Sequence, residues 1–212
     1  MKAHYLLQII YSISQLTALV YCTYKAWNHK TKQLYLLSIL LTFSFLQSLL
    51  QIFFESNTFK EYSISAYIIV EFFIHSSIIE HNIEKKLFLK YYSILKYLCI
   101  GFILFLAFSK LNYFPNNSWI SHIPDTIILF IGIIALNNLM VRSPVSLLKS
   151  FEFWILYSFI FIRLSLIPIE AIDYLYLNKF YSDSRMLWIK SHQYIYLIYH
   201  AFIIYSLKWI RK

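Results

Sequence analysis

Eight polar or charged side chains stand inside long apolar segments of this sequence, and any chemistry of the chain is expected to involve them. The eight are Glu71, His75, Asn137, Asn138, Arg163, Glu170, His192 and His200. An ionisable group near the centre of a membrane helix costs about 2.5–3.5 kcal/mol on insertion scales, so its presence indicates a functional site. Glu71 and Arg163 have opposite charges and expected depths of about 10 and 13 Å from the same membrane surface, which predicts an intramembrane ion pair.

The spacing of the other polar residues follows the helical repeat. His75 comes four residues after Glu71, and His192, Tyr196 and His200 recur at the same interval, so each set shares one helix face. Together with polar residues of neighbouring segments they predict a polar seam between helices. The further members of this seam are Asn137, Asn138 and Glu170.

The polar seam is open to three interpretations. It can be structural, because hydrogen bonds between membrane helices contribute about 0.6 kcal/mol each. It can be the path of an ion or a proton through a channel or transporter. It can also hold a haem between His75 and either His192 or His200, or a metal with Glu71, but the spacing is diagnostic of neither group. We therefore predict no cofactor and no metal site.

Familiar catalytic motifs are missing from the sequence. It contains no H-E-x-x-H, G-x-G-x-x-G, P-loop, C-x-x-C or G-x-S-x-G pattern. The two cysteines, Cys22 and Cys99, are too few for a disulfide framework or a cysteine metal site. We predict that the chain has no catalytic residues and is not an enzyme.

The elements that position these residues follow from the composition. Of the 212 residues, 59% are apolar and 14% are charged, against roughly 25% charged in an ordinary soluble domain. The mean hydropathy is +0.59. The apolar residues come in blocks that are too long and too uniformly apolar for alternating barrel strands of about 10 residues. The sequence therefore predicts an all-α, polytopic transmembrane helical bundle.

The apolar blocks number seven, and each is close to the roughly 20 residues that a helix needs to cross a bilayer core of about 30 Å. The predicted spans are 4–24, 33–54, 64–82, 91–109, 123–141, 151–172 and 188–208. An alternative with six spans places 91–109 or 123–141 in the membrane interface. Because the connections are short, residues 1–212 are predicted to form a single domain.

Basic residues in the loops predict the orientation of the bundle. Eleven of them fall on one side, against six on the other, which also has four acidic residues. The eleven are Lys25, Lys30, Lys32, Lys85, Lys86, Lys90, Arg142, Lys149, Lys208, Arg211 and Lys212. This excess predicts an outside N-terminus, a cytoplasmic C-terminus and a multi-pass location in the inner (cytoplasmic) membrane. The first block is expected to remain uncleaved, because Lys2 alone precedes it and no small-residue cleavage site follows it.

Three stretches resemble a family of small seven-helix membrane proteins of Bacteroidota. They are the runs from Tyr67 to Phe73 (YIIVEFF), from Leu147 to Tyr157 (LLKSFEFWILY) and from Leu187 to Tyr196 (LWIKSHQYIY). The chain departs from the family pattern in lacking a glycine after the Phe-Trp pair and an asparagine in the seventh span. The resemblance implies the seven-helix fold and its topology, and it implies no mechanism.

A second resemblance rests on size, span number and a composition rich in Lys, Ile, Tyr and Asn. In these features the chain is similar to membrane accessory proteins encoded beside the nuclease of type VI-B CRISPR systems. That resemblance implies an antiviral defence role, as a modulator that works through a partner.

Two functions are expected from these observations. The first is a non-catalytic accessory or sensor protein that acts through a partner protein, or as a homo-oligomer, in the lipid bilayer. The alternative is a small ion or proton channel or transporter that uses the polar residues around Glu71, His75, Arg163 and His200. The basic residues are scattered over several loops, so the net charge of +9 predicts contact with anionic lipid and no direct binding of nucleic acid.

Overall fold

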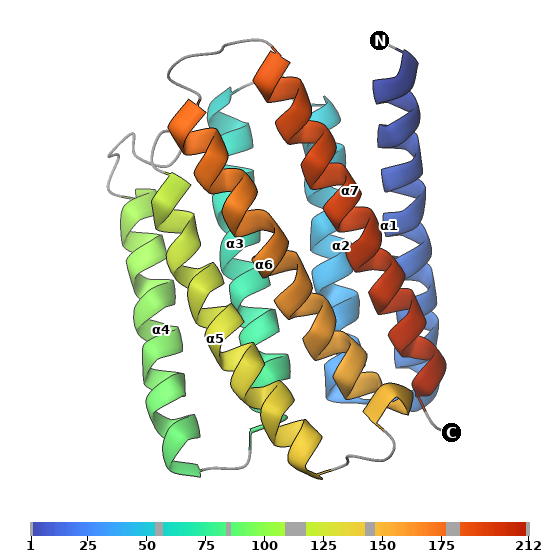
Figure 1. Cartoon of the computed structure of the whole chain (residues 1–212), viewed down its shortest axis with the longest axis vertical. Helices are drawn as coiled ribbons and strands as arrows, with labels where there is room; N and C mark the ends of the chain where they lie inside the picture. The colour runs from blue at the N-terminus through green and yellow to red at the C-terminus, as the bar shows by residue number, and fades with distance from the viewer. Residues whose placement is uncertain are drawn as a thin grey trace.

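The computed structural model describes residues 2–53, 57–83, 86–108, 118–142, 147–176 and 183–210, and the side chains near several helix ends lie outside this description. Seven α-helices make up nearly all of the described chain (Figure 1). Their bounds are Lys2–His29 (α1), Lys32–Phe53 (α2), Asn57–Glu80 (α3), Lys86–Phe108 (α4), Ser118–Arg142 (α5), Phe151–Tyr176 (α6) and Asp183–Ser206 (α7). Two short 3₁₀ turns, Leu147–Lys149 (η1) and Leu207–Trp209 (η2), precede α6 and follow α7.

The prediction of an all-helical chain is confirmed for the described residues, which contain no strand. Each of the seven apolar blocks corresponds to one helix, and α4 and α5 run alongside the others in the bundle (Figure 1). Several helices start earlier than predicted. The largest difference is in α3, which begins at Asn57 where the apolar block begins at residue 64, because the helix continues into flanking polar residues.

Four helices are long and apolar enough to cross a membrane. The stretches that meet this criterion are Leu6–His29, Lys32–Leu50, Pro124–Arg142 and Phe151–Ile169, in α1, α2, α5 and α6. Part of each of the other three helices falls outside the described side chains. A chain with four such helices has the character of a membrane protein, because an apolar surface of this length needs a lipid environment.

Six of the helices form a closed ring. Around it, α1 packs on α2, α2 on α3, α3 on α5, α5 on α6, α6 on α7, and α7 returns to α1. The remaining helix, α4, packs on α3 at the edge of the bundle (Figure 1). Successive helices run in opposite directions, so the two chain ends lie at opposite ends of the bundle (Figure 1).

Local features explain where helices end and how closely they approach. Lys30, with a φ of 51°, adopts the left-handed conformation that terminates α1. Ser150 caps the start of α6, since its hydroxyl accepts a hydrogen bond from the backbone N–H of Phe153 at 3.0 Å. Gly132 allows α5 to approach α6, because a Cβ atom there would lie 3.1 Å from Cγ1 of Ile160.

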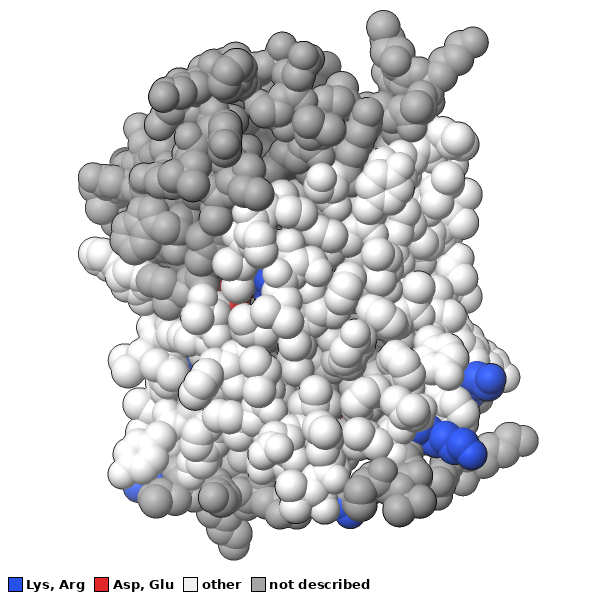
Figure 2. Space-filling view, in the orientation of Figure 1, with Lys and Arg blue, Asp and Glu red and all other residues white. Residues whose placement is uncertain are grey.

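The exposed basic side chains that the structure describes lie at one end of the bundle, which we call the base-rich end. Figure 2 shows blue side chains along this lower end, whereas the middle of the face is almost entirely uncharged. The exposed members are Lys30, Lys32, Lys90, Arg142, Lys149 and Lys208. The base-rich end is also the end at which the C-terminus lies (Figure 1).

Candidate functional site

Three charged side chains from three helices meet in the interior of the bundle. Arg163 of α6 lies between Glu71 of α3 and Asp125 of α5. Its Nη2 is 2.9 Å from Oε1 of Glu71, and its Nη1 is 2.8 Å from Oδ1 of Asp125. All three residues are buried, with 4%, 4% and 8% of Arg163, Glu71 and Asp125 exposed. The guanidinium thus uses its two terminal nitrogens to bridge two carboxylates, a geometry that lysine cannot reproduce.

His75 extends this group toward α7. Its Nδ1 is 3.3 Å from Nη2 of Arg163, and its Nε2 is 3.3 Å from the hydroxyl of Tyr199. A guanidinium only donates hydrogen bonds, so Nδ1 accepts and the proton of the neutral ring is on Nε2, which donates to Tyr199. The ring also lies against Phe159, with centroids 4.0 Å apart. We call Glu71, His75, Asp125 and Arg163 the Arg163 cluster.

A second set of hydrogen bonds joins α7 to α1. The Ser14 hydroxyl donates to the backbone carbonyl of Tyr11 at 2.7 Å. Having a single proton, it must accept from Nδ1 of His200, which lies 3.1 Å away. His200 is buried, and its ring lies near that of Tyr11, with the centroids 5.7 Å apart and the planes tilted by 32°.

The neighbouring Gln15 links α1 to α2. Its Nε2 donates to the Ser44 hydroxyl at 2.6 Å, and both side chains are buried. With this bond, all six ring helices contribute a polar side chain to the interior. We call these residues the polar layer: Ser14, Gln15, Ser44, Glu71, His75, Asp125, Arg163, Tyr199 and His200.

The polar layer lies near the middle of the bundle. Arg163 and Ser44 each come twelve residues after the start of their helices, α6 and α2, which is about 18 Å from the base-rich end. His75 is one turn closer to that end than Glu71. Figure 2 shows acidic and basic atoms side by side near mid-height of the face.

The structure therefore brings together Glu71, His75 and Arg163, and it places His200 in the same layer. Tyr196 is half-buried and its ring lies near those of Tyr199 and His200, at 6.1 and 6.4 Å.

Three other residues of the predicted seam are exposed or half-buried. Asn137 is exposed and Asn138 is half-buried. Asn137 is about 120° around α5 from Asp125, so it cannot face the same interior. His192 is half-buried two turns from His200, and the side chain of Glu170 lies outside the described residues. The residues of the polar layer connect all six ring helices through the interior. The predicted seam as a whole stays a prediction.

Asp125 was not predicted as a site residue, for a reason that lies in the helix boundaries. It follows the predicted start of its span by two residues, which would put it at the membrane surface. Because α5 begins at Ser118, Asp125 lies in its second turn and reaches the interior. Ser14, Gln15 and Ser44 carry no comparable signal, since neutral polar residues are common in such helices.

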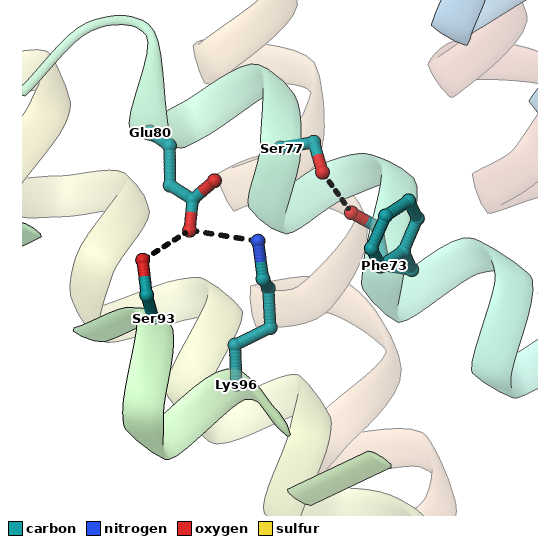
Figure 3. Close-up of polar contacts among 5 residues, drawn as sticks. All are labelled: Phe73, Ser77, Glu80, Ser93 and Lys96. Carbon is teal, nitrogen blue, oxygen red and sulfur yellow. Dashed lines mark hydrogen bonds and ion pairs between the residues drawn. The ribbon is translucent and has the colours of Figure 1, made fainter. Parts of the chain in front are cut away.

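A second ion pair, which is partly buried, attaches α4 to α3 (Figure 3). Nζ of Lys96 is 2.8 Å from Oε1 of Glu80, which also accepts a hydrogen bond from the Ser93 hydroxyl at 3.3 Å. Lys96 is only 3% exposed, and its ammonium lies 5.3 Å from the ring centre of Phe73. This pair was not predicted either. The sequence does contain a usable signal for it, because Lys96 is the sixth residue of one predicted span and Glu80 lies near the end of the preceding span.

The described residues give no support to a haem or metal between the histidines. They contain no group of three His, Cys, Asp or Glu side chains that could hold a metal ion. Both ring nitrogens of His75 already have hydrogen-bond partners. A metal ligand needs a free nitrogen lone pair, which His75 could offer only by leaving Arg163.

Comparison with known proteins gives no match to a protein-family model, to a curated protein or to a solved structure. The two family resemblances therefore stay predictions.

Removal of the arginine from the Arg163 cluster is expected to cost more stability than removal of either acid. Arg163→Met strands two buried carboxylates, so we expect the free energy of unfolding to fall by about 3–5 kcal/mol. Glu71→Gln and Asp125→Asn each leave Arg163 one acid and should cost less. The triple variant that combines all three changes should recover much of the loss, because no buried charge remains. Reversible denaturation of the protein in bicelles measures these differences.

A matched control is Asn137→Leu, which removes an exposed polar group from α5 and should change the free energy by less than about 0.5 kcal/mol. Equal stability of Arg163→Met and the triple variant would contradict the three-residue ion pair.

The Lys96–Glu80 pair predicts how firmly α4 is held. Lys96→Met should increase the population of opened α4 about fivefold, which corresponds to roughly 1 kcal/mol. Cys99, one turn further along α4 and buried, reports this opening through its rate of maleimide labelling. Cys22 of α1 is the internal control, and Ser93→Ala, which removes only the weaker contact, should have a smaller effect. Unchanged labelling of Cys99 in Lys96→Met would show that the pair does not hold α4.

Proposed function

We propose that all seven helices cross the inner (cytoplasmic) membrane, with the N-terminus outside and the base-rich end in the cytoplasm. Two observations support this proposal. The helices α3, α4 and α7 run alongside the four that are long and apolar enough to span (Figure 1). The exposed basic side chains that the structure describes lie at one end (Figure 2), and the sequence assigns eleven basic residues to that side against six to the other, as expected for the cytoplasmic side of a membrane protein.

Reporter fusions test this topology. Green fluorescent protein fused after residue 212 or after residue 84 should fluoresce, and alkaline phosphatase fused after residue 116 should be active. As controls, alkaline phosphatase fused after residue 212 or 84 should be inactive, and green fluorescent protein fused after residue 116 should not fluoresce. Active alkaline phosphatase at the C-terminus would contradict the number of spans or their orientation.

We propose further that the protein is a channel or transporter for protons or small cations, with the Arg163 cluster as its working centre. The observation that carries this proposal is one guanidinium held between carboxylates of two other helices in the middle of an apolar bundle. Buried ion pairs add little net stability compared with apolar packing, because the charges lose their hydration. Charges at membrane depth are therefore a functional signal rather than a device for stability.

The geometry suggests how a proton would act on the bundle. Protonation of Glu71 removes its charge and weakens the contact between α3 and α6, while Asp125 still holds α5 to α6. Protonation of Asp125 has the opposite effect. Arg163 Nε has no hydrogen-bond partner among the described residues, so the guanidinium has a further donor with which to exchange acceptors. Proton binding would thus select which helix is tied to α6, and this is the kind of two-state element that alternating access needs.

Flux through reconstituted liposomes tests the proposal. A potassium gradient and valinomycin set the membrane potential. We expect the luminal pH to change faster in liposomes that contain the wild-type protein than in empty liposomes. Glu71→Gln should abolish the flux, because it removes one titratable partner while Asp125 still pairs with Arg163. Asn137→Leu should retain full activity, and a monodisperse elution profile confirms that each variant is folded. Wild-type protein without proton or cation flux under either a potential or a pH gradient would contradict transport.

A second candidate function is that of an accessory or sensor protein that acts through a partner. The base-rich end favours it, because exposed basic side chains and an open cavity meet there on the proposed cytoplasmic side. In that case the Arg163 cluster would change the packing of the helices without passing an ion. Absence of flux, with a pH-dependent change in Cys99 labelling that Glu71→Gln removes, would favour the sensor over the transporter.

A further inference from the structure

An open cavity of about 360 Å³ lies at the base-rich end, apart from the polar layer. Its size is in the lower part of the range of small-molecule sites. Three parts of the chain that are distant in sequence form its polar wall. They contribute Thr31, just before α2, and Gln33 of α2, then Lys149 of η1 and Glu152 of α6, and finally Trp209 of η2.

Two side chains of this wall have hydrogen-bond donors without acceptors. Gln33 is 9% exposed, and its Nε2 has no partner among the described residues. The same is true of Nε1 of Trp209, which is also buried. Nearly all buried N–H groups in proteins are paired, so two unpaired donors in one cavity wall favour a ligand that has hydrogen-bond acceptors.

The surroundings of the cavity favour an acceptor with negative charge. Lys149, an exposed basic residue, is part of the wall. The cavity also lies at the N-terminal ends of α2 and α6, two helices of 22 and 26 residues. The free backbone N–H groups and the dipole at such ends attract anions, and phosphate above all.

Glu152 restricts the choice of ligand, because it lines the same cavity with a carboxylate. A ligand with negative charge alone would face this carboxylate. A ligand with a phosphate and an ammonium group satisfies both sides: the phosphate accepts from Gln33, Trp209 and Lys149, and the ammonium donates to Glu152.

We propose that this cavity binds a phosphoethanolamine group. The group occurs both as the headgroup of phosphatidylethanolamine and as a soluble compound. In the proposed topology the cavity opens on the cytoplasmic side, at the level of the exposed lysines, where the headgroups of the inner leaflet lie. The site is independent of transport through the polar layer, and either proposal can fail without the other.

Native mass spectrometry of the protein with equimolar phosphatidylethanolamine, phosphatidylcholine and phosphatidylglycerol tests the site. Wild-type protein should retain phosphatidylethanolamine in preference to the other two lipids. Gln33→Glu and Lys149→Gln should each weaken this retention about tenfold, as expected for the loss of a charge-assisted contact. Trp209→Phe keeps the aromatic ring, removes only the N–H, and should weaken retention less. Lys90→Gln removes an exposed base at the same end outside the cavity, and should have no effect.

Glu152→Gln gives the most specific result. Without the carboxylate, the preference should shift from phosphatidylethanolamine toward the anionic phosphatidylglycerol. Titration with O-phosphoethanolamine separates the two sources: binding of the lipid alone assigns the headgroup, and binding of both assigns the shared chemistry. Retention that does not distinguish the three lipids, or that is the same in wild type, Gln33→Glu and Lys149→Gln, would overturn the proposal.

Discussion

The arrangement of the helices depends on the ion pairs of the Arg163 guanidinium with Glu71 and Asp125. The guanidinium is buried and permanently charged, and it has only donors, so the bundle must bring acceptors to it from elsewhere. Glu71 and Asp125 supply them from α3 and α5, and His75 supplies a third. Each contact fixes the rotation of a helix about its own axis as well as its position, because a helix turned by one residue would move its acid about 100° away. Apolar packing alone does not impose such a register.

The polar layer extends this constraint around the ring. His75 is hydrogen-bonded to Tyr199 of α7, and the next residue of α7, His200, is hydrogen-bonded to Ser14 of α1. The bond between Gln15 and Ser44 then reaches α2. All six ring helices thus meet at one polar level, while α4 stays outside and depends on its own ion pair. A change of charge in the layer would be felt by every ring helix, which is a suitable basis for either transport or sensing.

The helices were predictable because a bilayer demands about 20 apolar residues in each span, and seven such blocks are plain in the sequence. Glu71 and Arg163 were predictable as a pair because buried charges need partners. The faces that meet were not predictable, because helices that are apolar on all sides do not show which side faces inward. The exposure of Asn137 could not be predicted for this reason, and Asp125 was missed because α5 begins earlier than its apolar block. The exclusion of α4 from the ring depends on packing order, which periodicity does not encode.

The central claim is that one guanidinium bridges two carboxylates within the bundle. Solid-state NMR of the protein in lipid bilayers tests it most directly, through dipolar recoupling between arginine side-chain ¹⁵N and the carboxyl ¹³C of Glu and Asp. Arg163 is one of four arginines, and Arg163→Lys identifies its signals by their loss. The account predicts short-range coupling of Arg163 to one glutamate and to one aspartate, which Glu71→Gln and Asp125→Asn remove in turn. Coupling to neither carboxylate, or to one that neither substitution removes, would contradict it.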